Sequence, residues 1–200
     1  MKKILFLLLL TFPVSACEKE VFDVIGNYSN PQKALLVMDM QLDALGANAK
    51  MPIVKSQIEP LINIVNTIIE DYSEKGYKII YIKTAFPKNS KEKGFIEGTA
   101  GIEIDPRVRV ISENIFVKNK PNAFFNKEFE NFLIANQVNE LYITGLMAEY
   151  CVKATALAAL KRNYTVHYIE NAVGTQDLKK LESTKNDLKK KGAQILTYQN

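Results

Sequence analysis

The stretch ELYITGLMAEYCVKATALAAL, residues 140–160, joins a strand pattern directly to a helix pattern. Its first part, ELYITGL (140–146), is a short apolar run of the kind found in strands buried on both faces of a parallel sheet. The alanine-rich remainder predicts a helix that begins near Cys151. A buried strand that leads into a helix indicates an α/β fold.

The same alternation continues along the chain. Further strands are expected at residues 33–40, 77–84, 114–118, 165–170 and 193–198. Apolar residues at helical spacing predict helices at 53–75, 126–137 and 175–192, and Leu178, Leu181 and Leu188 are expected to face inward in the last of them. Strands that alternate with helices predict a three-layer α/β domain, in which helices cover both faces of a mostly parallel sheet.

The chain opens MKKILFLLLLTFPVSAC, with two lysines, an apolar run and small residues before Cys17. This pattern predicts a signal peptide over residues 1–16. Its end resembles the lipobox of bacterial lipoproteins, which implies that Cys17 is acylated and anchors the protein to a membrane of the bacterial cell envelope. The alternative is a plain signal peptide cleaved after Ala16, which would release a secreted protein. Residues 17–32 lack periodicity and are expected to form a tether, and residues 33–200 to form one domain.

The charge balance argues against a nucleic-acid partner. The formal net charge is +4, and loss of Lys2 and Lys3 with the signal peptide lowers it to about +2. Nucleic-acid-binding domains concentrate much more positive charge on one face. The Gly98–Gly101 segment lacks the Gly-Lys-Ser/Thr ending of a phosphate-binding loop, so no nucleotide and no other cofactor is predicted.

Three side chains that can carry chemistry follow predicted strands. Asp39 and Lys118 stand at the ends of two apolar runs, and Cys151 comes shortly after a third. The carboxyl ends of parallel strands share one edge of the sheet, where ligands bind. A cysteine at a helix N-terminus faces unpaired N–H groups and the positive end of the helix dipole, so the sequence predicts a lowered thiol pKa and a reactive thiolate. Taken singly, each side chain also fits a structural role, and a free cysteine often packs as a small apolar residue.

Four segments together carry a family resemblance: ALLVMDMQLDAL (34–45), GTAGIEIDP (98–106), FVKNKPNAFFN (116–126) and LYITGLMAEYCVKATALAAL (141–160). They resemble the isochorismatase-like cysteine hydrolases, and the resemblance extends from Lys33 to the C-terminus. It implies that GTAGIEIDP forms a loop on the substrate side.

The resemblance also implies an Asp–Lys–Cys catalytic triad, formed here by Asp39, Lys118 and Cys151. Cys151 would attack the substrate carbonyl and form a thioester acyl-enzyme, Asp39 would carry the proton, and Lys118 would stabilise the thiolate. A cis peptide bond is implied between Leu146 and Met147. The backbone N–H groups of Met147 and Cys151 would then point at the oxyanion of the reaction intermediate.

The walls of a substrate pocket are expected near the same edge of the sheet. The candidate residues are Phe86, Asn122, Phe124, Leu146 and Tyr150. Apolar walls with a few polar groups fit a small-molecule substrate.

No metal site is predicted. The nicotinamidase branch of the family uses an Asp and three His residues as metal ligands after the second strand, whereas this chain has one histidine, His167, inside a predicted strand. The segment KTAFPKNSKEKG (83–94) contains no cluster of metal ligands, so nicotinamidase activity is disfavoured. A Cys151–His167 dyad is the alternative to the Asp–Lys–Cys arrangement.

The sequence therefore predicts a cysteine hydrolase that cleaves the C–N bond of a small amide or carbamoyl compound. No arginine occurs in the pocket segments, so a neutral or singly charged substrate fits better than a dicarboxylate. Two alternatives stay open: a vinyl-ether hydrolase that acts on isochorismate, and a lipid-anchored binding protein that kept the pocket. A homo-oligomer is also left open.

Overall fold

The computed structural model describes residues 25–199, which form a parallel sheet covered by helices. The sheet has six strands in the order β3-β2-β1-β4-β5-β6, and every neighbouring pair is parallel. The strands are β1 Gln32–Met38, β2 Lys78–Thr84, β3 Ile115–Lys118, β4 Val138–Gly145, β5 Thr165–Val173 and β6 Gln194–Leu196. Each predicted strand is present.

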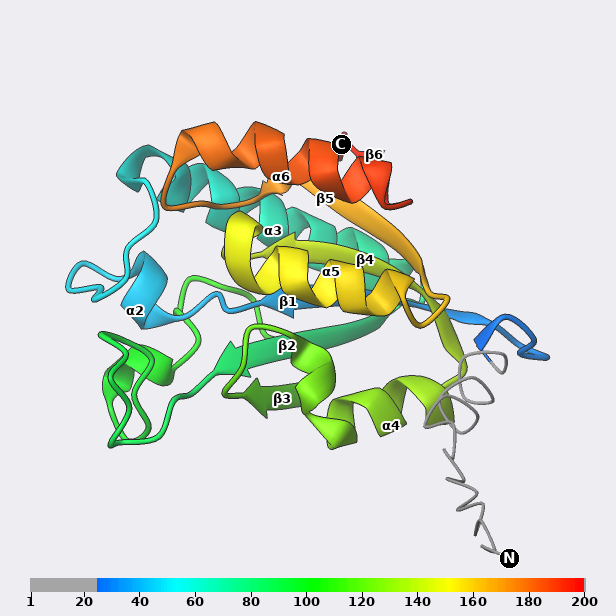
Figure 1. The fold of residues 1–200 in the computed structure, drawn as a ribbon, viewed down its shortest axis with the longest axis horizontal. Helices are drawn as coiled ribbons and strands as arrows, with labels where there is room; N and C mark the ends of the chain where they lie inside the picture. Colours follow the sequence, from blue (N-terminus) through cyan, green and yellow to red (C-terminus); the bar gives the residue numbers. More distant parts are fainter. Residues whose placement is uncertain (1–24, 200) are drawn as a thin grey trace, which may run out of the picture.

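Helices cover both faces of the sheet, as Figure 1 shows. One face carries α3 Ile58–Glu74, which the 3-10 turn Lys55–Gln57 precedes. The other face carries α4 Lys127–Ala135, α5 Lys153–Leu160 and α6 Leu178–Lys190. The predicted three-layer α/β fold is therefore confirmed.

The apolar run of β1 is continuous because both faces of this central strand are buried. Leu35 and Val37 pack against the α3 side, whereas Leu36 and Met38 pack against the side of α4 and α5. Successive side chains of a strand point to opposite faces, so a strand between two helical layers needs apolar residues at every position.

β1 and β4 approach each other closely just before the loops that carry the candidate site. Gly145 ends β4 with φ 103°, and a Cβ atom there would lie 2.1 Å from the carbonyl oxygen of Met38. The next N–H group, that of Leu146, donates to the same oxygen at 2.8 Å. A glycine at this position lets the two strand ends meet.

Three local features differ from the sequence-based expectations. A short helix, α2 Leu42–Leu45, and the 3-10 turn Ala123–Phe125 (η3) were not predicted. The inward orientation predicted for Leu178 is wrong, because its side chain is 54% exposed. Leu178 is the first residue of α6, directly after the cap residue Asp177. Further along the helix, Leu188 is buried as predicted, and Leu181 is partly buried against the core.

Residues 25–32 belong to the stretch predicted as a tether, and they contact the domain. Ile25 is 1% exposed within the core on the α4 side. The N–H group of Asn30 donates to the Gln137 side chain at 3.2 Å, and Gln32 begins β1. An apolar side chain and paired backbone groups thus hold this part of the chain against the sheet. The predicted signal peptide, the remainder of the tether and Cys17 lie outside the described residues.

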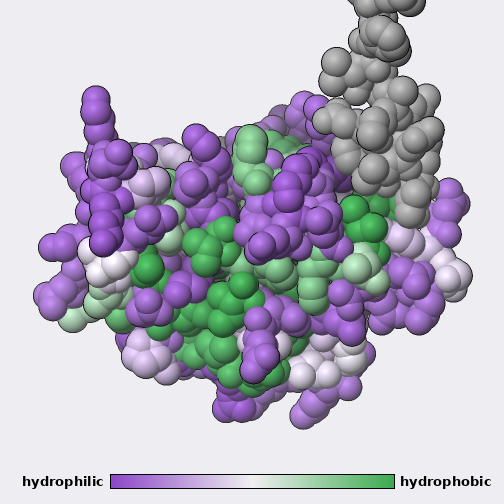
Figure 2. Space-filling view, turned by 90° about the horizontal axis from the view of Figure 1, so that it is seen from below, coloured by the Kyte–Doolittle hydropathy of each residue, from purple (hydrophilic) through white to green (hydrophobic). Residues whose placement is uncertain are grey.

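β3 is an edge strand, and it leaves apolar side chains uncovered. The exposed ones on or near it are Val110, Ile111, Ile115, Val117 and Phe125. Figure 2, which looks onto the molecule from below, shows a broad apolar area on this face. The homo-oligomer considered from the sequence stays a prediction. Within residues 25–199, no helix has the length and the apolar character needed to cross a bilayer.

We expect Gly145→Ala to destabilise the domain more than Gly192→Ala does. Both glycines have φ 103°, but a Cβ at position 192 meets nothing closer than a leucine methyl group at 4.0 Å. The control therefore reports the backbone strain alone, about 1–3 kcal/mol. The overlap with the Met38 carbonyl should add roughly 1–3 kcal/mol for Gly145→Ala. Urea unfolding of both variants measures the difference, and equal losses of stability would contradict it.

Candidate active site

The ends of neighbouring strands bring four side chains to one edge of the sheet. Asp39 directly follows β1, Thr84 is the last residue of β2, and Lys118 is the last residue of β3. Cys151 lies in a short π-helical segment, Ala148–Val152 (η4), which connects the turn after β4 to α5. All these strands run in the same direction, so their carboxyl ends meet at this edge.

The ammonium group of Lys118 joins the other three side chains. Its Nζ atom donates to Asp39 Oδ2 at 2.9 Å, to Cys151 Sγ at 3.1 Å, and to the Thr84 hydroxyl. The lysine side chain is only 1% exposed, and the Asp39 side chain 4%. A lysine has three N–H donors, so each of them already has an acceptor.

Thr84 was given no role by the sequence analysis, yet it contacts both charged groups. Its hydroxyl donates to Asp39 Oδ1 at 2.9 Å while it accepts from Lys118. The Gln41 side chain holds the Thr84 backbone at both its N–H and its C=O, each at 2.8 Å. The sequence offered one sign of this role: Thr84 is the last residue of a predicted strand, as Lys118 is of another.

The electrostatics of the thiol differ from the expectation. Burial raises the pKa of Cys151 most, the Asp39 carboxylate also raises it, and Lys118 lowers it; together these effects bring the pKa to about 12. The predicted lowering of the Cys151 pKa is therefore wrong, because desolvation and the nearby carboxylate outweigh the ammonium group. Burial would also lower the pKa of Lys118, but Asp39 and Cys151 outweigh it and raise that pKa above its ordinary value. The resting site thus holds a neutral thiol beside a carboxylate–ammonium pair.

The turn after β4 has the geometry that the resemblance implied. The peptide bond between Leu146 and Met147 is cis. The N–H groups of Tyr150 and Val152 donate to the Met147 carbonyl at 3.0 and 3.2 Å. No residue of the described chain accepts a hydrogen bond from the Met147 N–H group. Cys151 stands in the first turn of this helical segment, where N–H groups face outward along the axis.

A cavity of about 320 Å³ opens onto Cys151 and Asp39. The predicted pocket residues Phe86, Leu146 and Tyr150 line it. Its remaining walls come from residues that the sequence analysis did not name for the pocket: Met51, Thr84, Glu92, Phe95, Pro121, Met147 and Gln176. Met51 and Gln176 belong to loops that no sequence pattern places beside the strand ends, whereas Glu92 and Phe95 stand in the long segment that follows β2.

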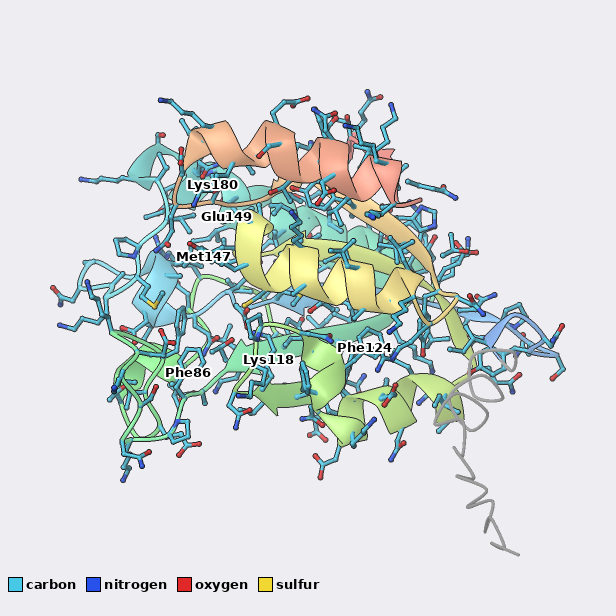
Figure 3. All side chains as sticks on the ribbon, viewed as in Figure 1. Phe86, Lys118, Phe124, Met147, Glu149 and Lys180 are labelled. Atoms are coloured by element: carbon cyan, nitrogen blue, oxygen red, sulfur yellow. The ribbon has the colours of Figure 1, made fainter. Side chains whose placement is uncertain are left out.

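Two predicted pocket residues lie elsewhere. Phe124 is 2% exposed and packs against the rings of Phe129 and Tyr164, with centroid distances of 5.2 and 5.7 Å. Asn122 caps the η3 turn by accepting from the Phe124 N–H group at 2.9 Å. The turn directs Phe124 into the core instead of the cavity. In Figure 3, Phe86 lies beyond the strand ends on one side of Lys118, and Phe124 lies on the other side, among the helices.

A second cavity of about 400 Å³ lies beyond the loop that carries Glu92 and Phe95. Its lining includes Asp43, Lys50, Lys93 and the Thr99–Gly101 segment, but none of Asp39, Lys118 and Cys151. The loop GTAGIEIDP, implied to be on the substrate side, thus borders this second cavity. The reactive groups place the candidate site in the smaller cavity.

The residues at this site do not fit the metal centre of the nicotinamidase branch. Phe86 and Pro87 stand in the loop after β2, and no group of three or more His, Cys, Asp or Glu side chains within residues 25–199 could hold a metal ion. His167 lies near the start of β5, where it contacts Glu140 at 3.1 Å and stacks on Tyr142 at 4.1 Å. The alternative Cys151–His167 dyad is therefore wrong, since Lys118 is the partner of Cys151.

Comparison with known proteins identifies relatives over most of the chain. The isochorismatase domain profile matches residues 33–200. An uncharacterized isochorismatase family protein of Bacillus subtilis is 30% identical over 72% of this chain and 79% of its own length. The nicotinamidase of Saccharomyces cerevisiae is 24% identical over 66% of this chain and 83% of its own. The pyrazinamidase of Pyrococcus horikoshii in complex with zinc superposes with a TM-score of 0.74 at 27% identity, over 84% of this chain and 100% of that one.

We expect the alkylation of Cys151 by iodoacetamide to respond to Asp39 and Lys118 in opposite directions. In the unmodified protein the rate should stay low near pH 7 and rise well above the ordinary thiol pKa of about 8.5. Asp39→Asn removes a group that raises the pKa of Cys151, so the profile should shift to lower pH. Lys118→Met removes the group that lowers this pKa, so the profile should shift to higher pH. Thermal melting checks that both variants fold, and a rate plateau near neutral pH in the unmodified protein would refute the neutral thiol.

Proposed function

The chain belongs to the isochorismatase family of hydrolases, and we propose that it is a cysteine hydrolase that cleaves the C–N bond of a small amide or carbamoyl compound. Asp39, Lys118 and Cys151 are the proposed catalytic residues. One observation carries the proposal: a buried ammonium group donates at once to a carboxylate and to a cysteine sulfur at the end of a cavity. This arrangement supplies a nucleophile, a proton carrier and a charge that holds both in place.

In the first half-reaction, Cys151 Sγ attacks the carbonyl carbon of the substrate while its proton passes to Asp39. The carbonyl oxygen becomes an oxyanion, to which the N–H groups of Met147 and Cys151 donate hydrogen bonds. When the tetrahedral intermediate collapses, the C–N bond breaks and Asp39 returns the proton to the leaving nitrogen. The products of this step are a free amine or ammonia and a thioester on Cys151.

In the second half-reaction, water attacks the thioester carbon. Asp39 takes a proton from this water, the C–S bond breaks, and Asp39 protonates the departing Cys151 sulfur. The enzyme returns to the neutral thiol with an ionised Asp39. Lys118 keeps its charge throughout, so it stabilises the carboxylate when Asp39 is ionised and the sulfur when Cys151 is ionised.

The raised pKa of Cys151 supports a role for Asp39 as the base. At neutral pH the thiol carries its proton, and attack on a carbonyl requires that proton to leave. Asp39 lies in the same hydrogen-bonded group through Lys118 and Thr84. Direct transfer to this carboxylate avoids a free buried thiolate. A protein that only binds ligands has no need of this proton path, so the site favours an enzyme over a binding protein.

The charges around the cavity favour an amide over isochorismate. A substrate with two carboxylates needs basic partners, and bidentate binding suits arginine. No arginine lines the cavity, and the N–H donors of Lys118 are already occupied. Arg107 pairs with Asp105 and Glu59, and Arg109 pairs with Glu70. These pairs lie away from the cavity lining.

We also propose that acylated Cys17 anchors the protein to the bacterial envelope, on the basis of the lipobox-like end of the predicted signal peptide. β1 begins at Gln32 and ends beside Asp39, so the chain enters the sheet at the edge opposite the cavity. Figure 1 shows this entry on one side of the molecule and α2, beyond the strand ends, on the other. An anchor before Ile25 would therefore leave the cavity open on the side remote from the attachment.

Removal of either reactive group should abolish the hydrolysis of small amides. We expect Cys151→Ala and Asp39→Asn to lower the rate of ammonia release by at least about 100-fold, the usual scale of a general acid–base or nucleophile loss. Thr84→Val should lower kcat by roughly 10- to 100-fold, because it removes a hydrogen bond to each charged group. Thr84→Ser keeps the hydroxyl and should restore most of the rate. Fast pyruvate release from isochorismate, with a panel of amides and ureido compounds all inert, would overturn the assignment.

The mature N-terminus should be an acylated Cys17. Mass spectrometry of the full chain, expressed with its signal peptide in a bacterial host, should show at least two acyl chains, because one chain gives only marginal membrane binding. Cys17→Ser should move the protein from the membrane fraction to the soluble fraction. A soluble wild-type protein whose chain begins with an unmodified Cys17 would support the secreted alternative instead.

A further inference from the structure

We propose that the site prefers amides whose far end carries a positive charge, and that the carboxylate of Glu92 at the rim of the cavity binds this charge. The inference rests on the proposed amide hydrolysis and adds the class of substrate. Its basis is the set of charged and polar groups that line the cavity, together with the partners that each of them already has.

The cavity has acidic groups but no free cation in its lining. Asp39 and Glu92 are the charged residues among the lining residues, and Lys118 lies just behind with each N–H donor occupied. Lys93 follows Glu92 in the sequence but lines the second cavity. Lys180 lies 5.6 Å from the centroid of the Tyr150 ring and is not a lining residue. A substrate carboxylate would therefore find no free basic partner on these walls.

Glu92 differs from Asp39 because its carboxylate is unpaired. The backbone N–H group of Glu92 donates to the Ser90 hydroxyl at 3.1 Å, which fixes the local turn. Its side chain has neither a hydrogen bond nor an ion pair with any residue between 25 and 199. The residue is exposed and lines the cavity, so its charge is free to bind a ligand.

The neighbouring groups suit the same kind of ligand. Gln176 donates through Nε2 to the Pro52 carbonyl at 3.3 Å, which leaves its Oε1 atom as an acceptor in the lining. Phe86 and Phe95 supply aromatic walls, and the faces of aromatic rings attract cations; the Tyr150 ring already has Lys180 near its face. An ammonium or guanidinium group would find a carboxylate, an amide oxygen and aromatic rings within one cavity.

Three amides of similar length test the charge preference. The terminal group is an ammonium in 4-aminobutanamide, a methyl group in pentanamide and a carboxylate in succinamate. We expect kcat/KM, measured by ammonia release, to fall in that order. Glu92→Gln should lower the ratio of kcat/KM for 4-aminobutanamide to that for pentanamide about five- to tenfold, the scale of one ion pair close to solvent.

Glu97→Gln is the matched control. It removes the same charge from the same loop, but Glu97 lines a separate hollow with Val117, Lys118 and Phe125 and is absent from the cavity lining. This variant should keep the wild-type ratio. The proposal would be overturned if the wild-type protein hydrolysed 4-aminobutanamide and pentanamide with equal kcat/KM, or if Glu92→Gln and Glu97→Gln changed the ratio of these two values equally.

A binding measurement separates this inference from the proposed function. Butylammonium should protect Cys151 from iodoacetamide at lower concentrations than butyrate does, and Glu92→Gln should remove the difference. If no amide is hydrolysed but this protection pattern holds, amide hydrolysis fails and the charge preference stands. If amides are hydrolysed while butylammonium and butyrate protect equally, the charge preference fails and the hydrolase stands.

Discussion

The site depends on one buried ammonium group that has three partners. Lys118 is enclosed at the end of β3, and an unpaired charge in such a place would cost several kcal/mol. Asp39 supplies the opposite charge, and Thr84 and Cys151 accept the remaining hydrogens. Loss of one partner of a buried pair typically costs roughly 3–5 kcal/mol. The ends of β1, β2 and β3 must therefore keep Asp39, Thr84 and Lys118 together for the domain to be stable, and Lys118 also contacts the thiol of Cys151.

The parallel sheet meets this constraint through its central strands. β1 lies between β2 and β4, so the ends of three neighbouring strands supply Asp39, Thr84 and the turn to Cys151, and β3 on the far side of β2 supplies Lys118. Asp39 adopts φ 53°, a conformation that few residues other than glycine take up. Gln41 fixes the next loop by bonding to the backbone of Thr84. These contacts tie the floor of the cavity to strands rather than to flexible loops, which favours a preorganised site.

Periodicity and the alternation of strands with helices predicted the sheet. The rule that parallel strands end at one edge put Asp39, Lys118 and Cys151 on the same edge, and the family resemblance implied that they form a triad. The failures are local and have physical causes. A single 3-10 turn decides that Phe124 points into the core while Phe125 is exposed, and two adjacent phenylalanines give no pattern that tells them apart. The direction in which the pKa of Cys151 shifts depends on how deeply the sulfur is buried and on how near the carboxylate lies. The position of a cysteine at the start of a helix gives no information on either. Thr84 ends a predicted strand, which placed it at the right edge of the sheet, but its uncharged side chain gave no sign of the hydrogen bonds to Asp39 and Lys118.

A neutral resting thiol also fits the proposed location of the protein. The bacterial envelope outside the cytoplasm is oxidising, and the thiolate is the form of cysteine that oxidants and disulfides attack. Cys151 has no second cysteine within residues 25–199 that could form a disulfide with it. A sulfur that keeps its proton until a substrate carbonyl arrives reacts slowly with such oxidants. At the proposed location, burial and the Asp39 carboxylate would have two effects: they would delay the formation of the proposed nucleophile until a substrate is bound, and they would protect the sulfur from oxidants that attack a permanent thiolate.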